Sequence, residues 1–240
     1  MQSTLNIHCR LENLPNVIAI AAGQSVLGNA VNLGEEHLAH ITLVLSDFAG
    51  DATTAAANVC KLLQPVAKDF KSVTVKMQGG KLSPVGSYVF WDAKKSMELD
   101  ALLEAVLVAI APALARERPL PPWVATVCSP AEQVKRKEYL KQYGTVNAFE
   151  FFRPHVTVGF RSSTATSAGC SGGSGEREQE REGEQEKTSH EQEPFLIPHG
   201  IEFAMSRIHV NAVGDNGTVL AGCDLGEIAL SGADIKHSIG

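Results

Sequence analysis

The sequence lacks an uninterrupted apolar run long enough to cross a membrane. A spanning helix needs roughly 18 apolar residues, whereas the best candidate, residues 101–115, is broken by Glu104 and Pro112. The amino end, MQSTLNIHCRLENLP, has neither the basic start nor the apolar stretch of a secretory signal. We therefore expect an intracellular protein that does not bind membranes, cytoplasmic by default, with a nuclear location also open.

Paired cysteines are missing as well. The five cysteines are odd in number, widely scattered and free of C-x-x-C spacing: Cys9, Cys60, Cys128, Cys170 and Cys223. This pattern argues against both a disulfide framework and a thiolate metal site. We expect reduced cysteines that mostly serve packing, and no cofactor.

An excess of positive charge is also absent. The formal net charge is -6, but residues 176–193 hold eight Glu against three basic residues, which leaves only about -1 for the rest of the chain. A nearly neutral domain does not have the basic surface that binds the phosphates of long duplex nucleic acid. A nucleotide or a short RNA remains a possible partner, and we expect a monomer.

The acidic stretch belongs to a low-complexity segment at 162–194. This segment is first Ser/Gly-rich and then Glu/Gln/Arg-rich, a composition that predicts disorder. A short solvated helix in its second part is the alternative, because Glu, Arg and Gln are good helix formers. Since patterned sequence resumes at Pro194, we interpret 162–194 as an insertion in a single domain spanning 1–240.

The remaining chain alternates β and α patterns without a solenoid repeat. One or two strands are predicted to open the chain, near residues 5–11 and 16–23, and a third near 37–48. Residues 71–80 and 86–93 are predicted to pair with each other, and the strands near 201–214 and 218–230 are joined by GDNG. One helix is predicted from Asp51 to about Gln64, where Pro65 restricts it. A second is predicted from Ser96 to Pro112, and a third over 130–143, where Gly144 ends it. The fold class is therefore α+β, with helices against largely antiparallel sheets.

Two strand-like segments each set a histidine two positions before a threonine. AHITLVL carries His40 and Thr42, and FRPHVTVGF carries His155 and Thr157. Because successive side chains of a strand face opposite ways, each His–Thr pair shares one face. The alternate apolar residues of each segment form the other face. They are Ile41, Leu43 and Leu45 in the first segment, and Phe152, Val156, Val158 and Phe160 in the second.

In the second segment Arg153, Gly159 and Arg161 share the predicted face of His155. Gly159 is expected to leave room beside the imidazole for a ligand. Only about 0.1 such H-x-T triplets with apolar neighbours are expected by chance. The plain alternative is that threonine is a good strand former and each histidine merely lies on a sheet. His8, His37, His199 and His209 are interpreted as sheet-surface or loop residues.

With these motifs the sequence resembles the two-histidine (2H) phosphoesterase superfamily, whose members carry two H-φ-T-φ motifs, here HITL and HVTV. The superfamily includes 2′-5′ RNA ligase-like proteins and cyclic phosphodiesterases. The resemblance covers the chain except 162–194. It implies a bilobed fold with a pseudo-two-fold axis, in which each lobe contributes one motif to a central cleft.

The residue types suit the chemistry independently. Imidazole has an unperturbed pKa of about 6.5, so one copy can be a base while another is an acid at neutral pH. Two histidines flanking a phosphodiester can thus open a 2′,3′-cyclic phosphate or cleave a 2′-5′ bond without a metal. Thr42 and Thr157 would bind the non-bridging oxygens. The assignment of acid and base stays open.

Substrate binding is predicted for Arg153 and Arg161, as cations on the same face, and for Tyr88 and Trp91, as stacking partners of a base. Three other functions compete with catalysis. The same fold can be a non-catalytic nucleotide- or RNA-binding module, His40 and His155 can be metal ligands, or the acidic insertion can serve protein interaction. Against a metal site, neither histidine has a carboxylate or second histidine at ligand spacing.

Overall fold

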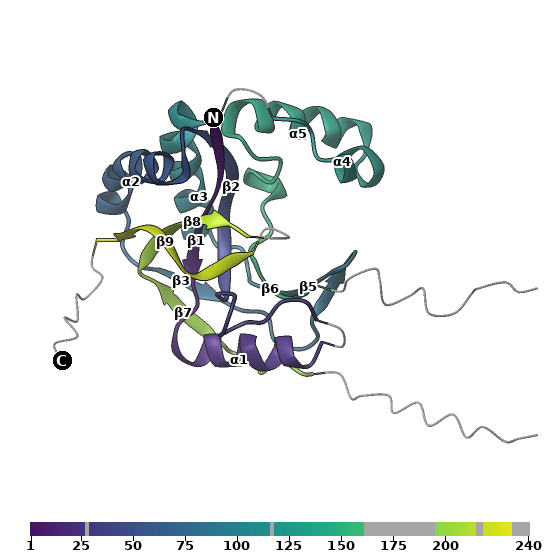
Figure 1. Ribbon diagram of the computed structural model, residues 1–240. Helices are drawn as coiled ribbons and strands as arrows, with labels where there is room; N and C mark the ends of the chain where they lie inside the picture. The colour runs from purple at the N-terminus through teal and green to yellow at the C-terminus, as the bar shows by residue number, and fades with distance from the viewer. Residues whose placement is uncertain (27–28, 116–117, 161–194, 215–217, 232–240) are drawn as a thin grey trace, which may run out of the picture.

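The computed structural model describes residues 1–26, 29–115, 118–160, 195–214 and 218–231. The predicted insertion at 162–194, and Arg161 before it, lie outside these residues. A sheet of seven strands has the order β4-β5-β6-β2-β1-β8-β9, and β3 and β7 form a second sheet (Figure 1). Every named strand pair is antiparallel. The strands are β1 (Gln2–Arg10), β2 (His40–Ala49), β3 (Val73–Lys76), β4 (Ser83–Val85), β5 (Tyr88–Asp92), β6 (His155–Phe160), β7 (Glu202–Met205), β8 (Arg207–Val213) and β9 (Val219–Ala229).

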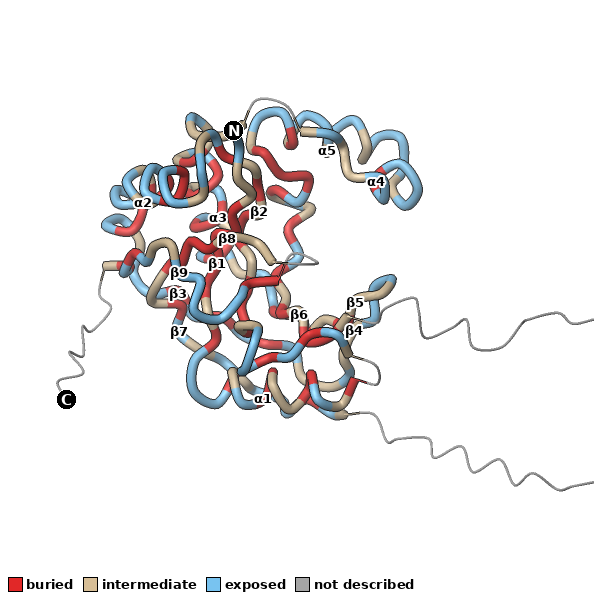
Figure 2. The backbone as a smooth tube through the Cα atoms, in the orientation of Figure 1, coloured by how far each residue is buried: buried red, intermediate tan, exposed pale blue. Residues whose placement is uncertain are grey.

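The helices flank the sheets, as the α+β prediction requires. They are α1 (Asn13–Gln24), α2 (Ala52–Asp69), α3 (Met97–Ile110), α4 (Pro122–Val127) and α5 (Pro130–Tyr143), with 3-10 turns η1 (Ala111–Ala113) and η2 (Phe149–Phe151). Helix α2 packs on β1, β8 and β9, α3 packs on β2 and β3, and α1 packs on β6. The main core lies between these helices and the sheets (Figure 2). No helix in the described part of the chain is both long and apolar enough to span a bilayer.

The large sheet has two halves that meet at a narrow seam. Strands β4, β5 and β6 form one half, and β2, β1, β8 and β9 form the other. At the seam between β2 and β6 the one registered pair is Ile41 with Val156. The seam therefore joins the two strands that carry the H-x-T motifs.

The helix boundaries follow local signals. Ser96 accepts a hydrogen bond from the Leu99 amide at the start of α3. Helix α5 begins with a capping box made by Ser129 and Glu132 and ends at Gly144, whose φ of 69° is left-handed. These helix predictions are confirmed.

Three predictions about the elements are wrong. Residues 16–23 belong to helix α1, because Ile18, Ala19, Ala22 and Gly23 are buried at helical spacing and alanine favours helix. Helix α2 continues through Pro65 to Asp69. Pro65 removes one hydrogen bond from the exposed side of that helix, while Leu63, Val66 and Ala67 keep it packed on the core.

The predicted pairing of 71–80 with 86–93 is the third error. Strand β3 pairs with β7, whereas β5 lies between β4 and β6. The strand pairing between the two predicted partners is limited to an isolated bridge between Met77 and Ala93 in the described residues. The predicted strand at 201–214 divides into β7 and β8, which belong to different sheets.

Candidate functional site

The four motif side chains lie on one face of the sheet at the seam. Because antiparallel partners share a face, Ile41 and Val156 point together into the core, where both are fully buried. Alternation then turns His40, Thr42, His155 and Thr157 to the opposite face, with each histidine across from the other strand's threonine. The charge of His155 also lowers the pKa of His40, as expected for neighbouring rings.

Both histidine rings are fixed in the same way. His40 Nδ1 lies 2.7 Å from the carbonyl oxygen of Leu38, and His155 Nδ1 lies 2.7 Å from that of Arg153. A carbonyl only accepts, so Nδ1 carries the proton in each ring. Nε2 is therefore the nitrogen that can exchange a proton, in both motifs.

His40 occupies the more buried of the two positions. Its exposed fraction is 8%. Burial, the largest effect, lowers its pKa to about 4, although the hydrogen bond to Leu38 acts in the opposite direction. Asn6 on β1 donates from its amide nitrogen to His40 Nε2, at 3.3 Å, and to Thr42 Oγ1, at 3.2 Å. His40 is thus a neutral ring with its proton-accepting nitrogen in a hydrogen bond.

His155 has an aromatic and ionic environment instead. The Phe90 ring lies against its imidazole, with centroids 3.9 Å apart. Burial lowers the pKa of His155, the Arg153 carbonyl and Asp92 raise it, and the Arg153 charge lowers it. The two motifs therefore share a geometry but differ in their surroundings.

Arg153 lies beside the site and is held by Asp92. Its Nε and Nη2 donate to the two carboxylate oxygens at 2.8 and 2.6 Å, a bidentate pair that fixes the guanidinium. Its guanidinium carbon lies 5.7 Å from the centre of the Phe90 ring. The side chain is half exposed, so a cationic edge remains near His155.

Of the two predicted stacking residues, Tyr88 lies on the motif face of the sheet with Phe90, and Trp91 lies on the core face. Tyr88 packs on Phe90 and Phe160, with centroids at 5.8 and 4.9 Å. Trp91 is opposite Val156, is 1% exposed and donates from Nε1 to the Gln78 carbonyl. It belongs to the core face, so its assignment to substrate binding is wrong.

Bulges in both motif strands correct two further expectations. In the pairing of β1 with β2, Leu43 is the extra residue, so Leu45 lies opposite Asn6 rather than on the face of Ile41. In the pairing of β5 with β6, Val158 is extra. A side chain at Gly159 would meet Val26, at 3.0 to 3.2 Å, so this glycine makes room for Val26, which follows α1, and not for a ligand.

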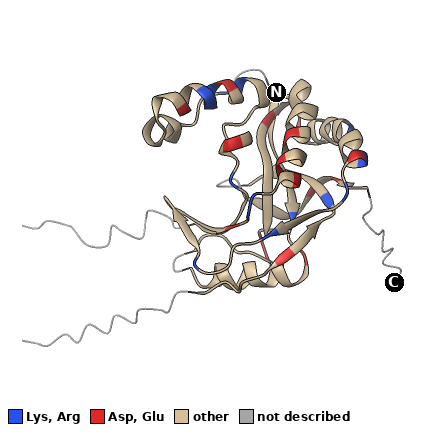
Figure 3. Cartoon of the chain, turned by 180° about the vertical axis from the view of Figure 1, so that it is seen from behind, with Lys and Arg blue, Asp and Glu red and all other residues tan. Residues whose placement is uncertain are grey.

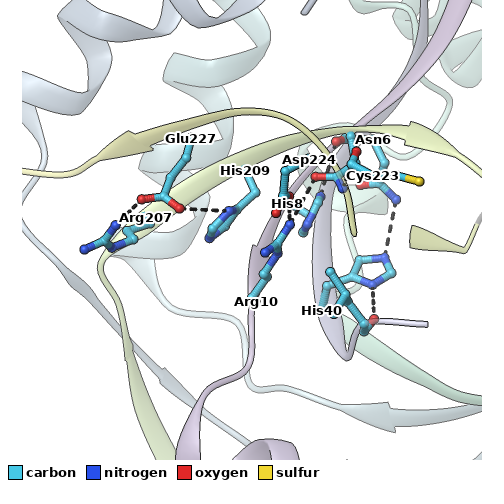
Figure 4. A network of polar contacts seen from close by, with 11 residues as sticks. Asn6, His8, Arg10, His40, Arg207, His209, Cys223, Asp224 and Glu227 are labelled. Carbon is cyan, nitrogen blue, oxygen red and sulfur yellow. Dashed lines mark hydrogen bonds and ion pairs between the residues drawn. The ribbon is translucent and has the colours of Figure 1, made fainter. Parts of the chain in front are cut away.

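A strip of polar side chains on β1 and β8, next to the first motif, was not predicted from the sequence (Figure 4). Asn6 and His8 are fully buried and His209 is 4% exposed, so the interpretation of His8 and His209 as surface residues is wrong. The His8 ring lies 4.9 Å from that of His40 and 5.7 Å from that of His209. The alternation N-x-H-x-R at residues 6–10 was the available signal, because it sets polar groups on one face of a strand.

Arg10 and two carboxylates border this strip. Arg10 pairs with Asp224, and His209 Nδ1 lies 3.6 Å from Glu227, which also pairs with Arg207. Burial lowers the pKa of His8 well below its usual value and that of His209 to about 4. Three neighbouring imidazoles are therefore neutral at pH 7.

Other features of the described surface do not include the motifs. Two hollows of about 840 and 800 Å³ are lined by residues around Lys71 and Lys95 and around Leu62 and Pro112. Neither hollow is lined by a motif residue. In the described ranges no group of three or more His, Cys, Asp or Glu side chains is arranged to hold a metal ion. Lys, Arg, Asp and Glu are interspersed over the elements (Figure 3).

Comparison with known proteins gives a likeness of fold. No protein-family model and no curated protein matches the sequence. The solved structure of TT0787 from Thermus thermophilus matches with a TM-score of 0.53 at 13% identity, over 96% of this chain and 99% of that one. LigT from E. coli, complexed with NADP+, matches with a TM-score of 0.48 at 11% identity, over 96% of this chain and 99% of LigT. A structure described as a phosphoesterase matches with a TM-score of 0.44 at 12% identity, over 95% of this chain and 98% of that one.

The chain accordingly shares the fold of TT0787, an α+β architecture with antiparallel sheets flanked by helices. At 13% identity the likeness concerns the fold alone.

Proposed function

We propose that the protein is a metal-independent phosphodiesterase that acts on 2′,3′-cyclic phosphates or 2′-5′ linked oligonucleotides, with His40 and His155 as general acid and base. The observation that carries the proposal is the seam. Two H-x-T motifs share one face, and each imidazole is tied through Nδ1 so that Nε2 is the exchangeable site.

The reaction needs only these groups and the substrate. For a cyclic phosphate, one Nε2 takes a proton from water as the water oxygen attacks phosphorus. The bond from phosphorus to one ribose oxygen breaks, and the other imidazolium delivers its proton to that oxygen. For a 2′-5′ bond, the 3′-hydroxyl replaces water as nucleophile. The hydroxyls of Thr42 and Thr157 donate to the non-bridging oxygens, where negative charge grows.

The depressed pKa values fit this mechanism once an anion is bound. In the free protein both imidazoles are neutral at pH 7, so either can act as a base. A phosphate between them favours the protonated form of a ring and raises its pKa, which supplies the acid. The rate should therefore have a bell-shaped pH dependence.

Recognition of the nucleotide is proposed for the second motif's side of the seam. The aromatic group of Tyr88, Phe90 and Phe160 offers a ring surface near His155, and aromatic rings stack on bases without strong sequence preference. Arg153, held by Asp92, adds a cation for a phosphate. We propose a nucleotide or short RNA as the substrate of a monomeric, cytoplasmic protein.

The test is turnover of a substrate panel in the presence of a chelator. Purified protein should open a 2′,3′-cyclic nucleotide or cleave a 2′-5′ linked dinucleotide, and 3′-5′ dinucleotides serve as comparison. His40→Ala and His155→Ala should each lose most of the rate while remaining folded, and His199→Ala, at an exposed loop position, should not. Nucleotide binding without turnover would favour the binding module, and activity that returns only with zinc would favour a metal site.

A further inference from the structure

Asn6 bridges the two functional groups of the first motif, and no part of the proposed reaction uses it. Its side chain is fully buried. Its amide nitrogen lies 3.3 Å from His40 Nε2 and 3.2 Å from Thr42 Oγ1. Figure 4 shows Asn6 and His40 facing each other. One amide thus contacts both the proton-exchanging nitrogen and the hydroxyl of the same motif.

The direction of these hydrogen bonds follows from the ring. His40 Nδ1 donates to the Leu38 carbonyl, so the neutral ring has its lone pair on Nε2. The amide nitrogen of Asn6 therefore donates one hydrogen to Nε2 and the other to Thr42 Oγ1. Because Thr42 Oγ1 accepts a hydrogen bond from Asn6, the hydroxyl proton of Thr42 can be donated to a different acceptor.

A backbone irregularity lies between Asn6 and the first motif. Leu43 is an extra residue in β2, so His8 pairs with Thr42 while Asn6 pairs with Leu45. Bulges of this kind re-aim side chains next to functional sites.

We propose that Asn6 is a positioning residue of the first motif: its amide turns the Thr42 hydroxyl proton toward a non-bridging phosphate oxygen and fixes the His40 Nε2 lone pair. The inference rests on the proposed phosphodiesterase function. Asn6 Oδ1 is buried and has no hydrogen-bond partner among the described residues, so the contacts of the amide nitrogen to His40 and Thr42 set the orientation of the amide.

The second motif has no such bridge among the described residues. The residue registered with Thr157 on its neighbouring strand is Phe90, whose ring packs on His155. A hydrophobic ring cannot orient a hydroxyl by hydrogen bonding. The role is therefore specific to Thr42 and His40, and loss of Asn6 should act through that pair.

Asn211 provides a matched control. It is registered with Asn6 on β8 and is equally buried. Its amide nitrogen donates to the Cys223 carbonyl, and its oxygen accepts from Arg10. Substituting it removes a buried asparagine from the same face without removing a contact to His40 or Thr42.

The experiment is a double-mutant cycle on kcat with the best substrate of the panel. Asn6→Ala and Thr42→Val should each lower kcat about 10- to 100-fold, with a smaller change in KM. Because the two residues share one hydrogen bond, the double variant should lose clearly less than the product of the two single losses. Asn211→Ala should change kcat less than about threefold, and its combination with Thr42→Val should be additive. The proposal would be overturned if the kcat losses of Asn6→Ala and Thr42→Val multiplied fully in the double variant. Equal kcat losses for Asn6→Ala and Asn211→Ala would also overturn it.

A second measurement does not need turnover. In Asn6→Asp the carboxylate accepts where the amide donated, so NMR titration of His40 should move to higher pH than in wild type, and Asn211→Asp should move it less. If the wild type turns over no substrate, the proposed function falls. The titrations still decide on Asn6: a larger shift for Asn6→Asp supports its contact with His40, and equal shifts overturn it.

Discussion

The buried histidines make the fold sensitive to acid, and the size of the effect can be worked out. His40 and His209 have a pKa of about 4 in the folded chain, against about 6.5 in an unfolded one. Between these values the unfolded chain binds protons that the folded chain does not. The free energy of unfolding is therefore highest above about pH 6.5 and falls as the pH drops toward about 4.

The magnitude is large compared with the stability of a domain. From pH 7 to pH 5 each of the two rings should reduce the free energy of unfolding by about 2 kcal/mol, or about 4 kcal/mol together. His8, whose pKa is also lowered, adds to the loss. The free energy of unfolding of a domain is about 5 to 15 kcal/mol in total. This change would therefore bring a modestly stable chain close to unfolding.

Urea unfolding at pH 7 and pH 5 measures the effect directly. His209→Phe removes one titrating ring from the strip and should reduce the pH-dependent loss by about 2 kcal/mol. His199→Ala, at an exposed position, should leave that loss unchanged. A wild-type free energy of unfolding that differs by less than about 1 kcal/mol between the two pH values would refute the reasoning.

Three further predictions concern the motif strands. Thr157→Val should lower kcat about 10- to 100-fold with the histidine titrations unchanged, because it removes one donor to the phosphate; an unchanged kcat would show that this hydroxyl does not contact the transition state. Asp92→Asn removes a carboxylate that raises the pKa of His155, so the ionisation of His155 in an NMR titration should move to lower pH, and a shift upward would contradict the assignment. Gly159→Ala brings a methyl group against Val26 and should destabilise the fold by about 1 kcal/mol or more, measured by thermal unfolding, with partial rescue by Val26→Ala.

The motif geometry was predictable because it depends on short-range alternation. In a strand the face of a side chain follows from parity alone, so His40 could be grouped with Thr42, and His155 with Thr157, without knowing what the strands pair with. The caps of α3 and α5 are equally local. Ser96, Ser129 and Gly144 contact backbone groups within four residues.

The missed features depend on partners far along the chain. The bulges at Leu43 and Val158 exist only in relation to β1 and β5, and each reverses the parity argument for the residues beyond it. The pairing of β3 with β7 joins Val73 to Met205, which no local pattern specifies. Trp91 was misplaced for a related reason: its face is set by its registration with Val156, and composition alone does not distinguish a core tryptophan from a stacking one.

The strip beside the first motif connects stability with function. Three neutral imidazoles and two asparagines on a buried sheet face cost stability, since apolar residues of similar size would bury the same area without unpartnered polar atoms. His8 Nδ1 donates to the Asn6 carbonyl oxygen, at 3.2 Å, and the His8 ring packs edge-on against His40. The strip thus fixes the strand segment that carries Asn6 and the ring that Asn6 contacts. Replacing His8 with phenylalanine should stabilise the fold at low pH, and a fall in kcat in that same variant would mean that the polar strip is retained for the orientation of His40 rather than for folding.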